Sequence, residues 1–183
     1  MGFRSCGGRR PAHAAARPAG NQDQGQAAHS NYSDQAEGVE KTHQARLALD
    51  AQTIDQVAPG EQQPESDHGF KGEGAENGVA PAGRWRHARQ WFSYLLDDPK
   101  AEARTLRLSF AAGDAGRRFD LFVNGQLIAE IELARPDAAG DIYMRDFPLP
   151  PALVSAAHGK LNVKFVAKPG SIAGGLYGLR LLR

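Results

Sequence analysis

The chain has very little cysteine, no long apolar run and almost no net charge. Its 183 residues include a single cysteine, Cys6, so neither an intramolecular disulfide nor a cysteine-rich zinc site can form. Lysine and arginine number 22 against 21 aspartates and glutamates, a balance that gives no field to attract nucleic acid or an anionic membrane. No apolar run approaches the length of a membrane span. We therefore expect no nucleic-acid partner, no membrane partner, no metal site and no cofactor.

The first residues lack large apolar side chains. Residues 1–32 are mostly glycine, alanine, glutamine, arginine and proline, as in "MGFRSCGGRRPAHAAARPAG". Such a segment buries too little surface to offset the entropy of ordering, so we predict a disordered tail over 1–32. No continuous apolar stretch follows its twin arginine. We therefore identify no signal peptide, and the cytoplasm is the default location.

The next segment has the composition of a helix. Ser33 and Asp34 are candidate N-caps, Glu37 lies early and Arg46 late. The apolar positions form only a weak stripe, which indicates little packing on one face. We predict a helical connector over 33–51.

Beyond the connector the pattern is that of strands. "TLRLSF" alternates strictly between apolar and polar residues, as a half-buried antiparallel strand does. "DIYMRDF", "KLNVKFVA" and "GLYGLRLLR" predict further strands, and "PLPPALVSAAHGK" predicts a short helix between Pro150 and Gly159. About seven short strands without alternating helices argue for an all-β protein, an antiparallel jelly-roll-like β-sandwich over 52–183.

One hairpin can be placed in register. "RFDLFVNGQLIAEIEL" predicts a turn at Asn124-Gly125. A two-residue turn would pair Leu121 with Ile128, which buries a poor set of side chains. A three-residue loop with a bulge at Gly125 buries the better set, so we predict the second register. It places Phe119 and Leu121 on the face of Leu127, Ala129, Ile131 and Leu133.

Both tryptophans lie in "RWRHARQWFSY". In "QWFSYLLD" both alternating sets are largely apolar, so we predict a strand covered on two sides, with Trp91 in the core rather than at a ligand. Trp85 lies between Arg84 and Arg86, before this strand, and both core and ligand contact remain open for it. Trp85 and Arg86 are therefore candidate binding residues.

An acidic and histidine-containing segment supplies two more candidates. "ESDH" holds Glu65, Asp67 and His68, side chains that could bind a metal or serve as an acid/base pair. Turn propensity explains the same composition without a function, and we favour that explanation. We retain Glu65 and His68 as binding candidates and predict no catalytic residue. The sequence contains no G-x-S-x-G, no H-E-x-x-H and no Cys/His dyad.

Several long stretches together carry a resemblance. These are "TIDQVAPGEQQPESDHGFKGEG", "GRWRHARQWFSYLL", "AGDAGRRFDLFVNGQ" and "VKFVAKPGSIAGGLYGLRLLR". In this order they resemble the C-terminal β-sandwich domain of the β-L-arabinofuranosidase-like enzymes of glycoside hydrolase family 127, over residues 52–183. The helix before them resembles the connector to the catalytic barrel.

The resemblance implies a catalytic-barrel partner but no catalytic activity for this chain itself. Enzymes of that family carry out their chemistry in an α/α barrel, with a cysteine nucleophile beside a zinc ion held by cysteines and a glutamate. This sequence has no such helical pattern, so no catalytic residue is carried over, and we expect no glycosidase activity.

Three hypotheses follow for the function. We favour a non-catalytic accessory module that packs on an α/α-barrel glycosidase domain and contacts carbohydrate through aromatic residues such as Trp85. The alternative is a purely structural or oligomerisation domain with no ligand. A free-standing enzyme using Glu65, Asp67 and His68 is the least favoured.

Overall fold

The computed structural model of the chain describes residues 1–2, 23–134 and 141–183. They form two compact units, 1–46 and 47–183. Helix α1, Asp23–Gln52, runs through the predicted connector but begins at Asp23 rather than Ser33. Its first residues are rich in glutamine and alanine, which favour helices. We placed this segment in the tail because it has almost no large apolar side chains. The rest of the predicted tail, apart from residues 1–2, lies outside the described residues.

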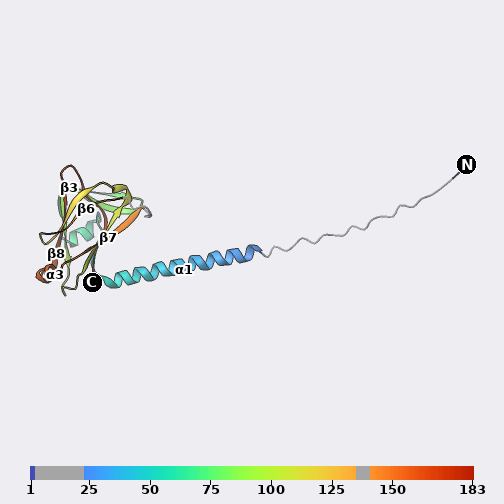
Figure 1. The fold of residues 1–183 in the computed structure, drawn as a ribbon, viewed down its shortest axis with the longest axis horizontal. Helices are drawn as coiled ribbons and strands as arrows, with labels where there is room; N and C mark the ends of the chain where they lie inside the picture. Colours follow the sequence, from blue (N-terminus) through green and yellow to red (C-terminus); the bar gives the residue numbers. More distant parts are fainter. Residues whose placement is uncertain (3–22, 135–140) are drawn as a thin grey trace. The chain divides into compact units, whose positions relative to one another are not determined.

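Strands are the main secondary structure of the second unit (Figure 1). The strands are β1 Thr53–Val57, β2 Lys71–Ala80, β3 Gly83–Asp97, β4 Thr105–Ala111, β5 Arg118–Val123, β6 Gln126–Glu132, β7 Ile142–Pro148, β8 Lys160–Ala167 and β9 Ala173–Leu182. The short helices are α2 Gln62–Asp67, η1 Ala112–Asp114 and α3 Pro151–Ala156. All described strand pairs are antiparallel.

The strands form two layers joined by β3. Their hydrogen-bonded order is β6-β5-β8-β3-β9-β4-β7, with β2 added on β3 and β1 on β9. Residues 86–88 of β3 pair with β9, whereas residues 91–97 pair with β8. A strand that changes partners in this way turns a corner between two sheets. The predicted all-β antiparallel sandwich is confirmed.

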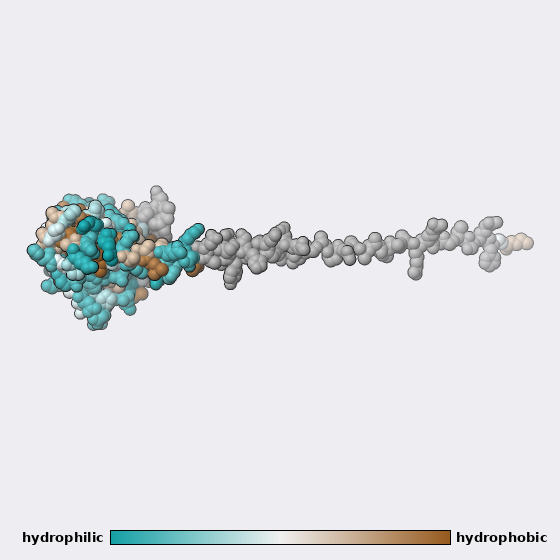
Figure 2. All heavy atoms as spheres, turned by 90° about the horizontal axis from the view of Figure 1, so that it is seen from below, coloured by the Kyte–Doolittle hydropathy of each residue, from teal (hydrophilic) through white to brown (hydrophobic). Residues whose placement is uncertain are grey.

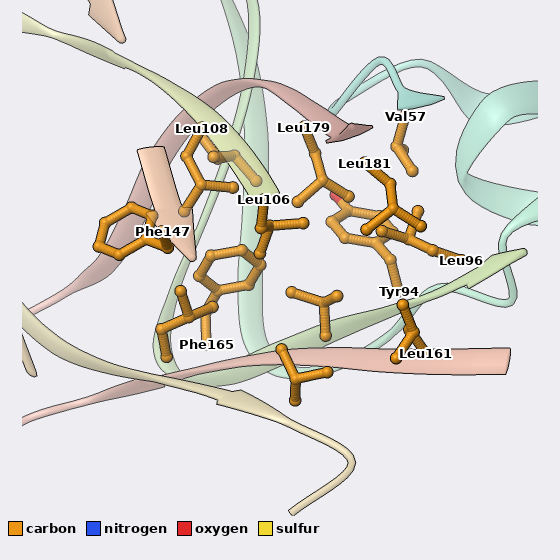
Figure 3. Close-up of a cluster of buried hydrophobic side chains, with 14 of the residues drawn as sticks. Val57, Tyr94, Leu96, Leu106, Leu108, Phe147, Leu161, Phe165, Leu179 and Leu181 are labelled. Atoms are coloured by element: carbon orange, nitrogen blue, oxygen red, sulfur yellow. The ribbon is translucent and has the colours of Figure 1, made fainter. Parts of the chain in front are cut away.

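The core lies between the two layers (Figure 3). Tyr94, Leu96, Leu161 and Phe165 project from β3 and β8 toward side chains of β4, β7 and β9. Burial of this apolar surface supplies the main stabilisation of the sandwich. The facing side chains include Leu106, Leu108, Phe147, Leu179 and Leu181.

The clearest local patterns predicted their elements correctly. The alternating "TLRLSF" lies in β4, where Leu106, Leu108 and Phe110 are fully buried. "KLNVKFVA" is the whole of β8, and the predicted strands at "DIYMRDF" and "GLYGLRLLR" overlap β7 and β9. The short helix between Pro150 and Gly159 is α3.

The predicted hairpin has the right core face except at Leu127, and its turn is different. Phe119 pairs with Ile131 and Leu121 with Ala129, as the prediction required. The turn itself has two residues, Asn124 and Gly125, because Val123 pairs with Gln126. The extra residue is Ile128 in β6, where the register shifts. This bulge places Ala129 and Ile131 on the predicted core face without a longer loop. Leu127 lies before the bulge, pairs with Phe122 and is 46% exposed, so its predicted face was wrong.

The prediction that Trp91 lies in the core is wrong. Phe92, Tyr94 and Leu96 of β3 face the core and are fully buried, whereas Trp91 and Leu95 lie on the opposite, outer face. On that face Leu95 is 37% exposed. Lys164 lies over the Trp91 ring, 4.3 Å from its centroid, and the indole N–H donates to Glu73 at 3.2 Å. Trp91 is thus a partly buried surface residue held by polar neighbours.

Strand β2 and helix α2 were not predicted. The sequence of β2, "KGEGAENGVA", is poor in β-branched and aromatic residues, and its pairing with β3 determines its conformation. Lysine and glutamate along β2 suit an edge strand, because charges discourage pairing with another chain. Helix α2 includes part of "ESDH", a segment that we assigned to a loop.

The outer surface of the sandwich is mainly hydrophilic on the face shown in Figure 2, with smaller apolar areas among the polar ones. Among the described residues, no helix combines the length and the hydropathy needed to cross a membrane.

Candidate functional site

Helix α2 brings Glu65 into a buried network with β3. The Nε of Arg86 donates to Glu65 Oε1 at 2.9 Å, and its Nη2 donates to Oε2. Tyr94 O–H and the Gly60 amide also donate to Oε1, at 2.7 and 2.8 Å. The Arg86 guanidinium lies 4.3 Å from the centroid of the Phe70 ring. This carboxylate has its partners within the protein, and we assign the network to the framework of the fold.

The network requires β3 to bend. Arg86 and Tyr94 both reach Glu65, although a straight strand would separate their Cα atoms by about 26 Å. The register with β2 shifts between Ala88 and Trp91, so β3 carries an extra residue there. The bulge bends β3 around the end of α2.

His68 fastens the end of α2 to the strands. Its Nδ1 lies 2.6 Å from the Pro64 carbonyl oxygen, and its Nε2 lies 3.0 Å from Asp55 Oδ1. Both partners are acceptors, so both contacts are hydrogen bonds when the ring is protonated. Burial lowers the pKa of His68, but the bonds to Pro64 and Asp55 and the charge of Asp97 outweigh it, and the pKa is raised.

Stability should depend on pH through His68. Because the folded-state pKa of His68 is raised, its contribution is complete below the ordinary value of 6.5 and is lost as pH rises through the raised value. We expect His68→Gln to cost about 1–2 kcal/mol at acid pH and clearly less at alkaline pH. Urea melts of both proteins across that range measure the difference. The exposed His43→Gln is the control, and a cost for His68→Gln that stays constant with pH would contradict the assignment.

A second polar cluster lies where several strands begin or end. We call it the strand-end site. It joins residues from β3, from η1 and the loop after it, from β7 and from β9. Its members are His87, Asp114, Arg117, Tyr143 and Tyr177.

An ion pair against two glycines forms the centre of the strand-end site. Arg117 Nη2 lies 2.7 Å from Asp114 Oδ1, and Nη1 donates to the Gly174 carbonyl at 3.3 Å. Gly175 has φ of 79°, and a Cβ on it would lie 1.9 Å from Asp114 Oδ2. Only glycine leaves room for the carboxylate there. A Cβ on Gly174 would lie 2.9 Å from the Arg86 carbonyl oxygen.

Strand β9 is irregular at this point. Against β3 the extra residue is Gly175, and against β4 it is Tyr177. Bulges redirect side chains and are common beside binding sites. The pair of bulges therefore accounts for how a central strand contributes to a polar cluster.

His87 and Trp85 extend the site along β3. Their ring centroids are 4.7 Å apart, and the rings are inclined by 30°. A Cβ on Gly78, the cross-strand neighbour of Trp85 in β2, would lie 2.4 Å from the indole ring. Glycine thus makes room for the indole across β2. Nε2 of His87 lies 3.5 Å from Glu76 Oε2.

The charges of the site influence one another. Burial raises the pKa of Asp114, although Arg117 and His87 oppose the shift. Burial and then Arg117 lower the pKa of His87, against the opposing effects of Glu76 and Asp114. Burial followed by the charge of Asp114 raises the pKa of Tyr177. Near neutral pH the site therefore holds one ion pair and an uncharged imidazole.

The described residues contain no group of three or more His, Cys, Asp or Glu side chains placed to hold a metal ion. The site can instead accept and donate hydrogen bonds beside aromatic rings.

A family model matches residues 48–182, and it is described as a family of unknown function, DUF6805. The chain belongs to this family. A search of curated protein sequences finds no match.

The DUF6805 domain is similar to several solved β-sandwiches at low identity. A family 35 carbohydrate-binding module from Clostridium thermocellum has 14% identity and a TM-score of 0.48, over 69% of this chain and 96% of that one. The module CBM6cm-2 of Cellvibrio mixtus lichenase 5A, solved with cellotriose, has 13% identity and a TM-score of 0.46, over 72% and 98%. The ANXUR1 extracellular domain of Arabidopsis thaliana has 14% identity and a TM-score of 0.48, over 70% and 41%. Likeness of this degree says nothing about what the DUF6805 domain binds.

The four candidate residues from the sequence fall in different places in the DUF6805 domain. Glu65 and Arg86 bond to each other in the buried network, and His68 bonds to Asp55 beside it. Trp85 lies against His87 of the strand-end site. The domain therefore brings Glu65 and Arg86 together, whereas Trp85, the adjacent residue of β3, lies against His87 instead.

Sequence reasoning missed the centre of the strand-end site. "AGDAG" and "GRRFD" contain Asp114 and Arg117, and neither residue was among the predicted binding candidates. One signal was present, the Gly174-Gly175 pair within a strand pattern, because such glycines indicate a bulge or a close approach.

Proposed function

We propose that the chain is a non-catalytic, carbohydrate-binding accessory module and that the strand-end site holds the sugar. The observation that carries the proposal is the ion pair of Asp114 and Arg117, 2.7 Å apart. Arg117 also bonds to Gly174, whose partner in β3 is His87, and the His87 ring lies against Trp85. The hydroxyl groups of a sugar both donate and accept hydrogen bonds. The C–H groups of its ring form an apolar face. A planar carboxylate and a planar guanidinium match such hydroxyl groups, and aromatic rings match the apolar faces.

The framework supports this role. The side chains of Asp114 and Arg117 are only 17% and 23% exposed, so their positions are restricted before a ligand arrives. Pre-positioned polar groups lose less entropy on binding than flexible ones. The buried network of Glu65 and Arg86 holds β3, which carries Trp85 and His87 between its buried residues. Trp85 thus keeps its proposed role in binding, whereas we assign Glu65, Arg86 and His68 to the framework.

The resemblance of residues 52–183 to family 127 domains extends the proposal. It implies that the module packs on an α/α-barrel glycosidase domain.

Sugar binding should change the fluorescence of Trp85. In a Trp91→Phe background Trp85 is the one remaining tryptophan. Titration with arabinose oligosaccharides, arabinan fragments and other oligosaccharides is expected to give a saturable change. Asp114→Asn should weaken binding about tenfold or more, because the carboxylate accepts charge-assisted hydrogen bonds.

Asp67→Asn is the matched control, since Asp67 is exposed on α2 and should leave binding unchanged. Absence of any change with the whole sugar panel would reject the proposal in favour of a structural or oligomerisation domain. Binding that Asp114→Asn leaves intact would place the sugar elsewhere.

A further inference from the structure

The charges at the centre of the strand-end site are already paired within the chain. Arg117 bonds to Asp114 and to the Gly174 carbonyl, so part of its donor fork is occupied. An anionic ligand bound to Arg117 would lie close to the Asp114 carboxylate, whose Oδ1 is 2.7 Å from Nη2. Like charges at close range repel strongly where water is partly excluded.

Glu76 indicates which nitrogen of His87 carries the proton. The Glu76 carboxylate can only accept, and it lies 3.5 Å from Nε2 of His87. In the uncharged ring the proton therefore lies on Nε2, and Nδ1 is an acceptor. Nδ1 is buried and has no hydrogen-bond partner in the described part of the chain. It needs a donor.

A second polar atom of the site is also without a partner. The hydroxyl of Tyr143 is buried and makes no hydrogen bond to the described residues. Buried polar atoms without partners cost free energy, which a ligand recovers when it supplies them. A sugar hydroxyl can donate to Nδ1 of His87, whereas a carboxylate, which has acceptors alone, cannot.

We propose that the strand-end site selects neutral, hydroxyl-rich sugars and discriminates against sugar acids. The inference rests on the proposed function and specifies the ligand class of the same site. The acceptor Nδ1 and the Asp114 carboxylate take hydroxyl protons, while Arg117 and Tyr143 donate to hydroxyl oxygens. Nδ1 is buried in the free chain, so binding requires neighbouring side chains to move. Two neighbours of His87, Trp85 and Arg117, are partly exposed.

The test compares matched neutral and acidic sugars on the full chain. Isothermal titration at neutral pH uses methyl galactoside against methyl galacturonide and methyl glucoside against methyl glucuronide, together with methyl arabinofuranoside and arabinose oligosaccharides. We expect neutral sugars to bind at least about tenfold more tightly than the acids. Asp114→Asn should weaken the binding of neutral sugars and tighten the binding of sugar acids. The substitution frees Arg117 and removes the charge that repels the acids. Arg118→Ala, an exposed neighbour, should change neither affinity.

A pH series and the histidine spectrum give a second readout. Neutral-sugar binding should be lost as pH falls through the lowered pKa of His87, because Nδ1 then carries a proton and no longer accepts. The ¹⁵N shifts of His87 should report the Nε2–H form in the free chain. Sugar acids that bind as tightly as neutral sugars, or an Nδ1–H form, would overturn the inference and leave the proposed function standing. No binding by any sugar would overturn both.

Discussion

Replacing Arg86 with methionine is expected to destabilise the sandwich by about 3–5 kcal/mol, because it leaves the Glu65 carboxylate buried without its cation. The two side chains are 10% and 6% exposed, so water replaces little of the lost interaction. Burial alone would raise the pKa of Glu65, but hydrogen bonds from Arg86, Gly60 and Tyr94 outweigh it and lower that pKa. Urea unfolding at neutral pH measures the cost.

Two further variants separate this effect from a general loss of arginine. Arg107 forms a bidentate pair with Asp146 on the outer face, where the two side chains are 29% and 45% exposed. Arg107→Met should therefore cost at most about 1 kcal/mol. The double variant Glu65→Gln with Arg86→Met should recover part of the stability, since no unpaired charge remains. If Arg86→Met unfolded no more readily than Arg107→Met, the buried network would not hold the fold.

Neighbouring aromatic residues of β3 should differ sharply in their contribution to stability. Phe92 is fully buried and stacks on Phe165 with ring centroids 4.7 Å apart, so Phe92→Ala should cost about 3–5 kcal/mol. Trp91, on the outer face, contacts Lys164 and Glu73, and Trp91→Ala should cost about 1 kcal/mol.

Urea melts of the two alanine variants test the assignment of faces. A strand buried on both sides, as the sequence suggested, would make the two costs similar. That outcome would mean that another layer covers the outer face of β3.

Features that depend on a few adjacent residues were predicted correctly, whereas features that depend on pairing between distant strands were not. Strand β4 and helix α3 were predictable because alternation and a proline start are properties of a few adjacent residues. The face of Trp91 was not, because Trp91 and Phe92 begin two apolar sets and only the partner strands decide which set is buried. Strand β2 was missed for the same reason, since pairing with β3 overrides its own weak preference.

The candidate site depended even more on distant contacts. Trp85 could be proposed from its arginine neighbours, but its partner His87 had no signal of its own. Arg117 bonds to Gly174, more than fifty residues further along the chain, and no local pattern encodes that approach. Glu65 was a binding candidate because of its carboxylate. In the structure that carboxylate forms a buried ion pair with Arg86.

The alternation of β3 assigns neighbouring residues to separate tasks. Arg86 and Ala88 point into the protein. Trp85 and His87 instead lie at the strand-end site. If these residues bind sugar as we propose, positions 85 and 87 can be varied to change the ligand while 86 and 88 are held constant. Random mutagenesis across the whole stretch would mix altered specificity with unfolded protein, so a library restricted to alternate codons is the efficient one.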